Sequence, residues 1–325
     1  MKRRDFLINT LKGSVIASLP ISLSSFNLTN NKVEIGIVAD VHQDIIHDGV
    51  SRLSFFIDAM EKRKPDFIIQ LGDFSLPRKQ NQPFIDKWNS FNGPKYHVLG
   101  NHDMKDFGFT KEETKKWWKM QKRYYSFDLN DFHFIILDGN DKNPKPWNGY
   151  HRYIGPKQKL WLKDDLKKTL KPTVLFSHQS LESKGGISNR KEIRNILENS
   201  TTKNGHPKVV ACLSGHHHTD YVKSINKIPY IQINSMSYKW VGDKYKYSRF
   251  SEQIEKAFPN LDKTCPYKEP LYTVLTLDPK KKMLHLEGKK TSFIAPTPSD
   301  LKIPNAEKMS PIISERNLKI KLLND

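Results

Sequence analysis

Several short apolar runs of the chain lead directly into residues that could bind a metal ion. The runs are 33–39, 67–71, 96–99, 174–176 and 209–213. The residues that follow them are Asp40, His42, Asp73, Asn101, His178, His216 and His218. Carboxylate, imidazole and amide donors without a thiolate suit Fe, Mn or Zn in a reactive centre better than a thiolate-bound structural zinc. The residue types therefore indicate a metal site.

The pattern of the chain predicts an α/β fold that can bring these residues together. Apolar runs of strand length alternate with helical patterns, and strands of an open α/β sheet present their carboxyl ends to one ligand crevice. Helices are expected around 53–60, 82–91, 110–120 and 156–170. Apparent hairpins at 124–137 and 219–233, and a strand pair at 271–277 and 283–286, add antiparallel content that a purely parallel sheet lacks. Beyond about residue 291, the proline-containing tail is expected to be weakly structured.

The order of the motifs is more specific than any one of them. They are Asp40-x-His42, Gly72-Asp73, Gly100-Asn101-His102-Asp103, His178 and Gly215-His216-x-His218. This series resembles the calcineurin-like metallophosphoesterase family over roughly residues 33 to 235. The resemblance implies a four-layer αββα sandwich with two mixed β-sheets. It also implies two metal ions, one held by Asp40, His42 and His218 and the other by Asn101, His178 and His216, with Asp73 bridging them.

The resemblance further implies a hydrolase that cleaves small anionic phosphomonoesters or phosphodiesters through a hydroxide shared by the two metals. His102 is the expected catalytic residue that is not a ligand, either contacting the phosphoryl oxygens or protonating the leaving oxygen, and Asp103 would orient it. A purely structural role for His102 is the alternative. His217 lies between two ligands that must point the same way, so it is expected to face elsewhere.

Substrate choice must come from the loops around the metals. Arg152 and Arg190 are candidates to clamp a phosphate bidentately, and Tyr238 and Trp240 are candidates to stack on a ring; surface packing is the alternative for each. The segment 153–162 loosely resembles the branch that hydrolyses nucleotide diphosphates and cyclic nucleotides. The competing functions are therefore a nucleotide diphosphatase or cyclic-nucleotide phosphodiesterase, then a nuclease, then a noncatalytic binding module.

Residues 1–30 resemble a twin-arginine export leader. Arg3-Arg4 precedes Phe6-Leu7, and the apolar stretch that follows is too short and too mild to span a membrane. We expect an exported, periplasmic, soluble protein that meets the export machinery through this leader. The rest divides into a domain at 31–290 and a C-terminal tail at 291–325, without a membrane span.

The chain carries a formal charge of +19, from 54 Lys and Arg against 35 Asp and Glu. Such a charge concentrates anionic substrates or binds polyanions nonspecifically, but lysine is spread along the whole chain. No block of interleaved aromatic and basic residues typical of a known nucleic-acid module is present, so no specific nucleic-acid partner is expected. The two cysteines, Cys212 and Cys265, are expected to be unpaired.

Overall fold

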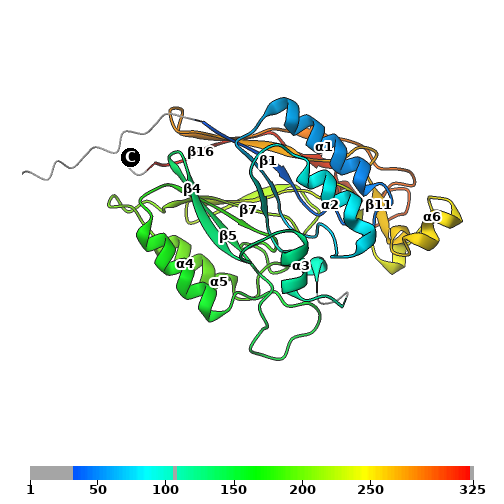
Figure 1. Cartoon of the computed structure of the whole chain (residues 1–325), viewed down its shortest axis with the longest axis horizontal. Helices are drawn as coiled ribbons and strands as arrows, with labels where there is room; N and C mark the ends of the chain where they lie inside the picture. The colour runs from blue at the N-terminus through cyan, green and yellow to red at the C-terminus, as the bar shows by residue number, and fades with distance from the viewer. Residues whose placement is uncertain (1–31, 105–107, 323–325) are drawn as a thin grey trace, which may run out of the picture.

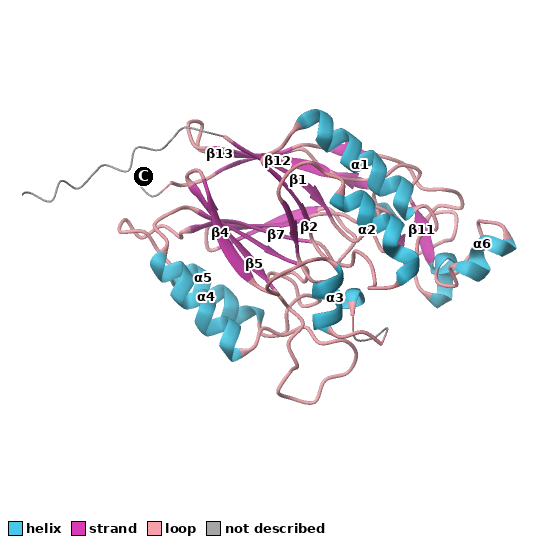
Figure 2. Ribbon diagram, in the orientation of Figure 1, coloured by secondary structure: helices cyan, strands magenta, loops and turns pink. Residues whose placement is uncertain are grey.

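The computed structural model describes residues 32–104 and 108–322. The expected export leader at 1–30 lies outside these residues. Two six-stranded β-sheets face each other at the centre of the molecule, and helices cover their outer faces (Figures 1 and 2). The predicted αββα sandwich with two mixed sheets is confirmed.

The first sheet has the strand order β16-β13-β12-β1-β2-β3. Its strands β1, β2 and β3 run parallel, whereas β12, β13 and β16 join by antiparallel pairing. The bounds are β1 (Val33–Val38), β2 (Phe67–Gln70), β3 (Lys95–His97), β12 (Thr273–Asp278), β13 (Met283–Leu286) and β16 (Arg316–Lys319).

The second sheet has the order β4-β5-β6-β7-β9-β8. The four central strands are parallel, and each edge strand closes one of the two predicted hairpins. The bounds are β4 (Tyr125–Leu129), β5 (Phe132–Leu137), β6 (Thr173–Ser177), β7 (Val209–Ser214), β8 (Tyr221–Ile225) and β9 (Ile228–Gln232). Two short pairs lie outside these sheets: β10 (Tyr238–Trp240) with β11 (Thr264–Pro266), and β14 (Lys289–Lys290) with β15 (Ile312–Ile313).

The helices pack on the outer faces through apolar stripes at helical spacing. Helices α1 (Gly49–Arg63) and α2 (Gln82–Asn89) cover the first sheet, and α4 (Pro156–Lys168) and α5 (Arg190–Asn199) cover the second (Figure 1). Helix α3 (Lys111–Trp117) begins with a capping box, in which Thr110 and Glu113 exchange hydrogen bonds and satisfy amides that the first turn leaves free. Helix α6 (Glu252–Ala257) lies beside the β10–β11 pair.

The main core fills the space between the sheets. Ile35 and Ile37 of β1 point into it, where Phe134 and Phe176 of the second sheet meet them, while Val38 joins the layer beneath α1 and α2. This division follows from the two-residue period of a strand, which sends successive side chains to opposite faces. Because both faces of the central strands are covered, these strands are largely apolar.

The expectation of a weakly structured tail beyond 291 is wrong. Strand β16 pairs with β13 at the edge of the first sheet, and Ile313, Ile320 and Leu322 are buried. The tail escaped prediction because β16 reads Arg-Asn-Leu-Lys and, as an edge strand, lacks the apolar signature of a central one. Helix α5 was also not anticipated.

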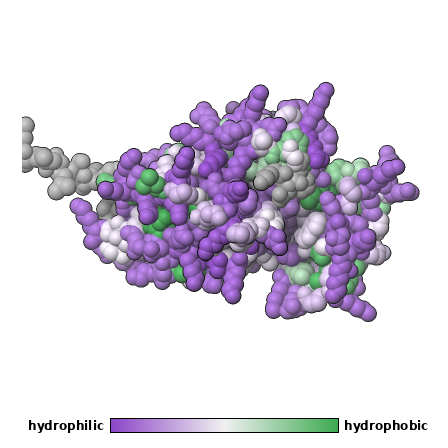
Figure 3. Space-filling view, turned by 90° about the horizontal axis from the view of Figure 1, so that it is seen from below, coloured by the Kyte–Doolittle hydropathy of each residue, from purple (hydrophilic) through white to green (hydrophobic). Residues whose placement is uncertain are grey.

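No helix among the described residues is long and apolar enough to cross a membrane. On the face seen in Figure 3, hydrophilic side chains dominate and hydrophobic ones are scattered. Both cysteines are buried and unpaired, as expected.

Candidate metal centre

The sequence-predicted ligands all follow the carboxyl ends of parallel strands, three from the first sheet and two from the second. Asp40 and His42 follow β1, Asp73 follows β2, Asn101 follows β3, His178 follows β6, and His216 and His218 follow β7. Because the two sheets face each other, these five loops meet at one edge of the sandwich. The structure thus brings together all seven residues, although they are scattered along the chain.

The backbone at this edge is unusual. Five of the predicted ligands have a left-handed backbone, with φ of 51° at Asp40, 52° at His42, 51° at Asp73, 76° at His216 and 48° at His218. Such angles are uncommon for residues other than glycine and persist where the surroundings enforce them, often at functional sites. Here neighbouring loops hold each other in these conformations through backbone hydrogen bonds. The amide of Asp40 donates to the Gly72 carbonyl at 3.1 Å, and the amide of His42 donates to the Asp73 carbonyl at 2.9 Å.

Two glycines of the motifs are needed for close approach. Gly72 has a φ of 92°, and a Cβ added there would lie 2.6 Å from Nδ1 of His178. A Cβ on Gly215 would collide with the Asp40 carboxylate. Larger residues at either position would therefore push the ligands apart.

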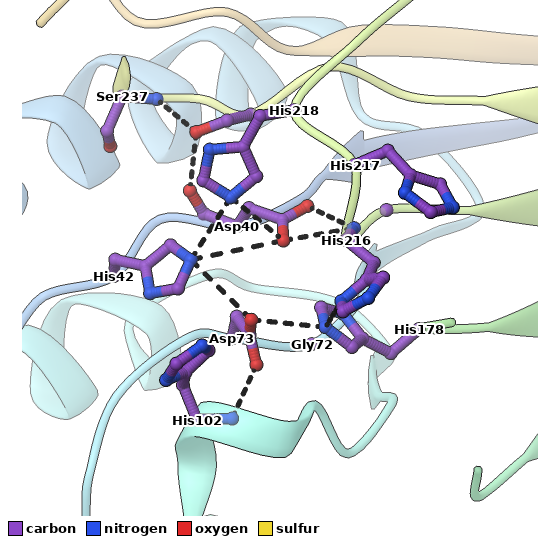
Figure 4. A network of polar contacts seen from close by, with 12 residues as sticks. Asp40, His42, Gly72, Asp73, His102, His178, His216, His217, His218 and Ser237 are labelled. Carbon is purple, nitrogen blue, oxygen red and sulfur yellow. Dashed lines mark hydrogen bonds and ion pairs between the residues drawn. The ribbon is translucent and has the colours of Figure 1, made fainter. Parts of the chain in front are cut away.

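Asp40, His42 and His218 form the first cluster (Figure 4). Nε2 of His218 lies 3.2 Å from Nε2 of His42 and 3.3 Å from Oδ1 of Asp40. The Nδ1 of His218 is 3.0 Å from the Tyr238 carbonyl, so it carries the proton and leaves the Nε2 lone pair directed at the cluster. Burial lowers the pKa of His42 to about 3, which keeps this imidazole neutral and able to coordinate.

Asp73, His178 and His216 form the second cluster, and Asn101 joins it. Nε2 of His178 lies 3.1 Å from Oδ2 of Asp73, 3.1 Å from Oδ1 of Asn101 and 3.2 Å from Nδ1 of His216. Its Nδ1 donates to the Leu71 carbonyl at 2.8 Å. Burial lowers the pKa of His178, but the charge of Asp73 outweighs it and raises the pKa to about 9. A metal at this cluster would therefore displace a proton from His178.

One carboxylate oxygen reaches both clusters. Oδ2 of Asp73 is 3.1 Å from Nε2 of His178 and 3.5 Å from Nε2 of His42 (Figure 4). Burial raises the pKa of Asp73, but the neighbouring His178 and His102 lower it well below its usual range, so Asp73 is ionised. Buried nitrogen and oxygen lone pairs that converge in this way fit two cations, with Asp73 between them.

His102 and Asp103 lie beside Asp73, but Asp103 makes contacts other than the expected ones. Its Oδ2 accepts hydrogen bonds from the amides of Gly100 at 2.8 Å and Asp73 at 2.9 Å, and its Oδ1 accepts one from Phe74 at 2.6 Å. These bonds hold the Asp73 loop. His102 is half-buried, its amide donates to Oδ1 of Asp73 at 2.8 Å, and it lines the space next to both clusters.

A pocket of about 680 Å³ opens on the clusters, and we call it the tryptophan pocket. Besides three histidines of the clusters, its wall includes Tyr150, Arg152, His217, Lys239 and Trp240. The Trp240 side chain is 43% exposed and thus accessible to a ligand. Arg152 packs over the rings of Trp147 and Tyr150 and donates to the Gly185 carbonyl.

Two of the expected substrate residues are placed differently. Tyr238 is 1% exposed, and its ring packs 5.3 Å from that of His42 and 5.0 Å from that of His218. It lines the tryptophan pocket at the edge of the clusters, but it is almost wholly buried and supports the ligands. Arg190 is the first residue of α5 and does not line the tryptophan pocket.

Three pocket residues were not singled out as functional from the sequence. The hydroxyl of Tyr150 is 3.1 Å from Nε2 of His216, and Nζ of Lys239 donates to the carbonyls of His217 at 3.2 Å and His218 at 3.0 Å. The ring of His217, expected to face elsewhere, lines the pocket, and its Nε2 is 2.9 Å from the Ser180 hydroxyl. The motif spacing held no signal for them.

The fold is a sandwich of two mixed sheets, and the metal donors lie at the ends of its strands. These two features together are typical of proteins built around a dimetal centre. Residues 33–220 match the calcineurin-like phosphoesterase family. Because the match covers more than half of the chain, the protein belongs to that family, as the motif series predicted.

The protein is similar to a manganese-dependent ADP-ribose/CDP-alcohol diphosphatase of Arabidopsis thaliana, with 26% identity over 142 residues. This match covers 36% of the chain and 45% of the relative, so the chain spans less than half of that relative's length. A crystal structure of a dimetal phosphatase from Danio rerio has a TM-score of 0.57 at 13% identity, covering 81% of this chain and 98% of that one. GAP50, described as the anchor in the inner membrane complex of Plasmodium, has a TM-score of 0.54 at 16% identity, covering 89% of each chain. Both structures share the fold.

Proposed function

We propose that this protein is a dimetal hydrolase of small phosphomonoesters or phosphodiesters. The observation that carries the proposal is the position of Asp73, whose Oδ2 lies 3.5 Å from the His42 imidazole of one cluster and 3.1 Å from the His178 imidazole of the other. A carboxylate so placed can link two cations and offset their mutual repulsion. Membership of the calcineurin-like phosphoesterase family supports the same activity.

When bound, two metal ions supply a nucleophile at neutral pH and neutralise charge on the phosphoryl oxygens. The chain's own residues position the reaction. Arg152 and Lys239 give the tryptophan pocket a positive wall for an anionic phosphoryl group. In hydrolysis, water oxygen bonds to phosphorus, one phosphorus–oxygen ester bond breaks, and the leaving oxygen takes a proton. His102 lies beside Asp73 and faces the pocket, where its imidazole can donate that proton.

The metals we propose are Mn, Fe or Zn. The donors of both clusters are imidazole nitrogens and carboxylate or amide oxygens, a mixture that suits these ions. The Arabidopsis relative is described as manganese-dependent, which makes manganese the first ion to test.

A nucleotide diphosphatase is the second candidate. The exposed Trp240 ring in the tryptophan pocket favours it, because a base can stack on such a ring. The Arabidopsis relative is described as acting on ADP-ribose and CDP-alcohols. ADP-ribose hydrolysed faster than p-nitrophenyl phosphate and its bis ester would favour this candidate.

The activity is tested by hydrolysis of p-nitrophenyl phosphate and bis(p-nitrophenyl) phosphate after loading with manganese. Loss of a group that only supports a metal ligand lowers activity by about 10–100-fold. We expect Asp73→Asn to lower kcat/KM by more than this. Asp66→Asn is the matched control, because the Asp66 carboxylate accepts a hydrogen bond from the Glu34 amide in an exposed place. Hydrolysis that survives Asp73→Asn unchanged would contradict the proposal.

We also propose that the protein is exported to the periplasm through the twin-arginine route. The resemblance of residues 1–30 to a twin-arginine leader is what supports this proposal. Replacing Arg3-Arg4 with lysines should retain the protein in the cytoplasm, as measured by cell fractionation. Unchanged distribution between the fractions would contradict this proposal.

A further inference from the structure

A second pocket, of about 460 Å³, meets the tryptophan pocket at the metal centre. Both pockets are lined by His42, Asp73 and His102, but their other walls differ. We call the second one the Asp44 pocket, because Asp44, Ser75, Arg78, Asn81 and Phe258 contribute to its wall. A phosphorus atom held at the metal centre would therefore have a pocket on each side of it.

The Asp44 pocket is polar but internally neutralised. The Asp44 carboxylate accepts hydrogen bonds from the Asn81 side chain at 2.9 Å and from the Leu76 amide at 2.7 Å. The Arg78 guanidinium lies 3.8 Å from the same carboxylate. Apart from Asp73 and Asp103 beside the metal centre, the wall pairs one anion with one cation, so it is unsuited to a second phosphate and suited to an uncharged group with hydroxyls.

A buried hydroxyl in the Asp44 pocket lacks a partner. Ser75 is 3% exposed, and among the described residues its Oγ has no hydrogen-bond partner. Buried polar groups in proteins are nearly always satisfied, so an unpaired one in a pocket wall points to a ligand or water that completes it. A hydroxyl on a substrate fits, since a hydroxyl can both donate and accept.

The tryptophan pocket differs from the Asp44 pocket in both charge and aromatic content. Arg152 and Lys239 make it basic, and Trp240 offers an aromatic face. A phosphomonoester would fill only one of the two pockets, whereas a phosphodiester has a substituent for each.

We propose that the substrate is an asymmetric phosphodiester, with an aromatic substituent in the tryptophan pocket and a small, uncharged polyhydroxy alcohol in the Asp44 pocket. This inference rests on the proposed hydrolase function and adds its substrate class. Ser75 then determines specificity through a hydrogen bond to a hydroxyl of that alcohol.

The test compares two chromogenic diesters, p-nitrophenyl glyceryl phosphate and p-nitrophenyl propyl phosphate, which differ only in hydroxyl groups. We expect the manganese-loaded enzyme to prefer the glyceryl ester in kcat/KM by about fivefold or more, the effect of one net hydrogen bond. Ser75→Ala should abolish this preference by lowering kcat/KM for the glyceryl ester.

A second variant tests the Asp44 pocket without touching a buried residue. Gln80 is exposed at the wall of this pocket, so Gln80→Trp narrows it. We expect Gln80→Trp to lower kcat/KM for both diesters by about tenfold or more, while p-nitrophenyl phosphate is hydrolysed as before. Gln82→Trp is the matched control, because Gln82 is exposed nearby and does not line the pocket.

The outcomes separate the two proposals. Equal rates on the two diesters, unaffected by Ser75→Ala and Gln80→Trp, would overturn the inference and leave the hydrolase intact. Failure to hydrolyse any of the three esters after loading with Mn, Fe or Zn would overturn the hydrolase itself and the inference with it.

Discussion

Asp103 fixes the backbone of Asp73, the residue between the two clusters, through a hydrogen bond of 2.9 Å from the Asp73 amide to its Oδ2. The same carboxylate also accepts from the amides of Gly100 and Phe74, so three loop amides converge on one buried side chain. The position of the shared carboxylate therefore depends on a residue that is not itself one of the predicted ligands.

Asp103→Asn should weaken metal binding by about 10–100-fold. In the wild-type protein both carboxylate oxygens accept hydrogen bonds from loop amides, whereas in the variant one of them is replaced by an NH2 group, which cannot accept. The free energy of unfolding should also fall by about 1–3 kcal/mol. Metal affinity is measured by competition with a chelator, and stability by urea unfolding without metal. Asp66→Asn serves as control, and wild-type metal affinity in Asp103→Asn would contradict the assigned role.

Tyr150→Phe should lower the affinity of the second cluster for its metal by about tenfold, because the Tyr150 hydroxyl holds Nε2 of His216 at 3.1 Å. The substitution leaves the ring in place, so unfolding without metal should be unchanged. Tyr272→Phe provides the matched comparison, because Tyr272 packs against Phe56 of α1 and lines neither pocket at the metal centre. Equal metal affinity in both variants would show that the hydroxyl does not support His216.

Arg316→Met should lower the free energy of unfolding by about 3 kcal/mol, because it leaves the buried Asp220 carboxylate without its charged partner. Arg316 of β16 pairs with Asp220 through two bonds of 2.8 and 2.9 Å, and the two side chains are 11% and 6% exposed. Arg63→Met, which breaks an exposed pair with Glu34, should cost only about 0–1 kcal/mol. Similar urea midpoints for the two variants would mean that the tail does not stabilise the fold.

His133 should make stability depend on pH. Its Nδ1 lies 2.6 Å from Asp128 and its Nε2 2.8 Å from Asp165. Burial lowers the pKa of His133, but hydrogen bonds to Asp165 and Asp128 outweigh burial and raise it above its usual value. When the pKa of a histidine is raised in the folded state, its contribution to stability is fully present at a pH below its unfolded-state pKa of about 6.5. This contribution is lost as the pH rises through the folded-state pKa.

The wild-type protein should therefore exceed His133→Gln in urea midpoint at about pH 5.5 by more than at about pH 8.5. His285→Gln, which removes an exposed histidine bonded to Asn317, corrects for general effects of pH. A difference that grows with pH would contradict the assignment.

The sequence was informative where residue type and position were both constrained. Asp40 and His178 could be placed because each follows an apolar strand, and strand ends meet in an α/β sandwich. The family motifs then supplied the pairing of clusters. The family resemblance also implied the order of the layers, whereas the strand patterns alone indicated only an α/β fold with antiparallel content.

Other features depended on contacts that leave no local trace. Tyr238 and Trp240 lie two positions apart on one short strand and share a face by its period, yet one packs on the ligands and the other is accessible, a difference that only tertiary packing decides. Tyr150 reaches His216 across 66 positions of chain. Strand β16 is polar, and its place is set by pairing with β13 and by the bond from Arg316 to Asp220.

The central claim is that the two clusters hold a pair of metal ions linked by Asp73, and elemental analysis of the purified protein after loading with Mn, Fe or Zn and desalting tests it most directly. We predict about two metal equivalents per chain for the wild-type protein, and about one or fewer for Asp73→Asn. Asp66→Asn should match the wild type. A folded wild-type protein that retains less than about one equivalent of every ion, or an Asp73→Asn variant that keeps both, would contradict the account.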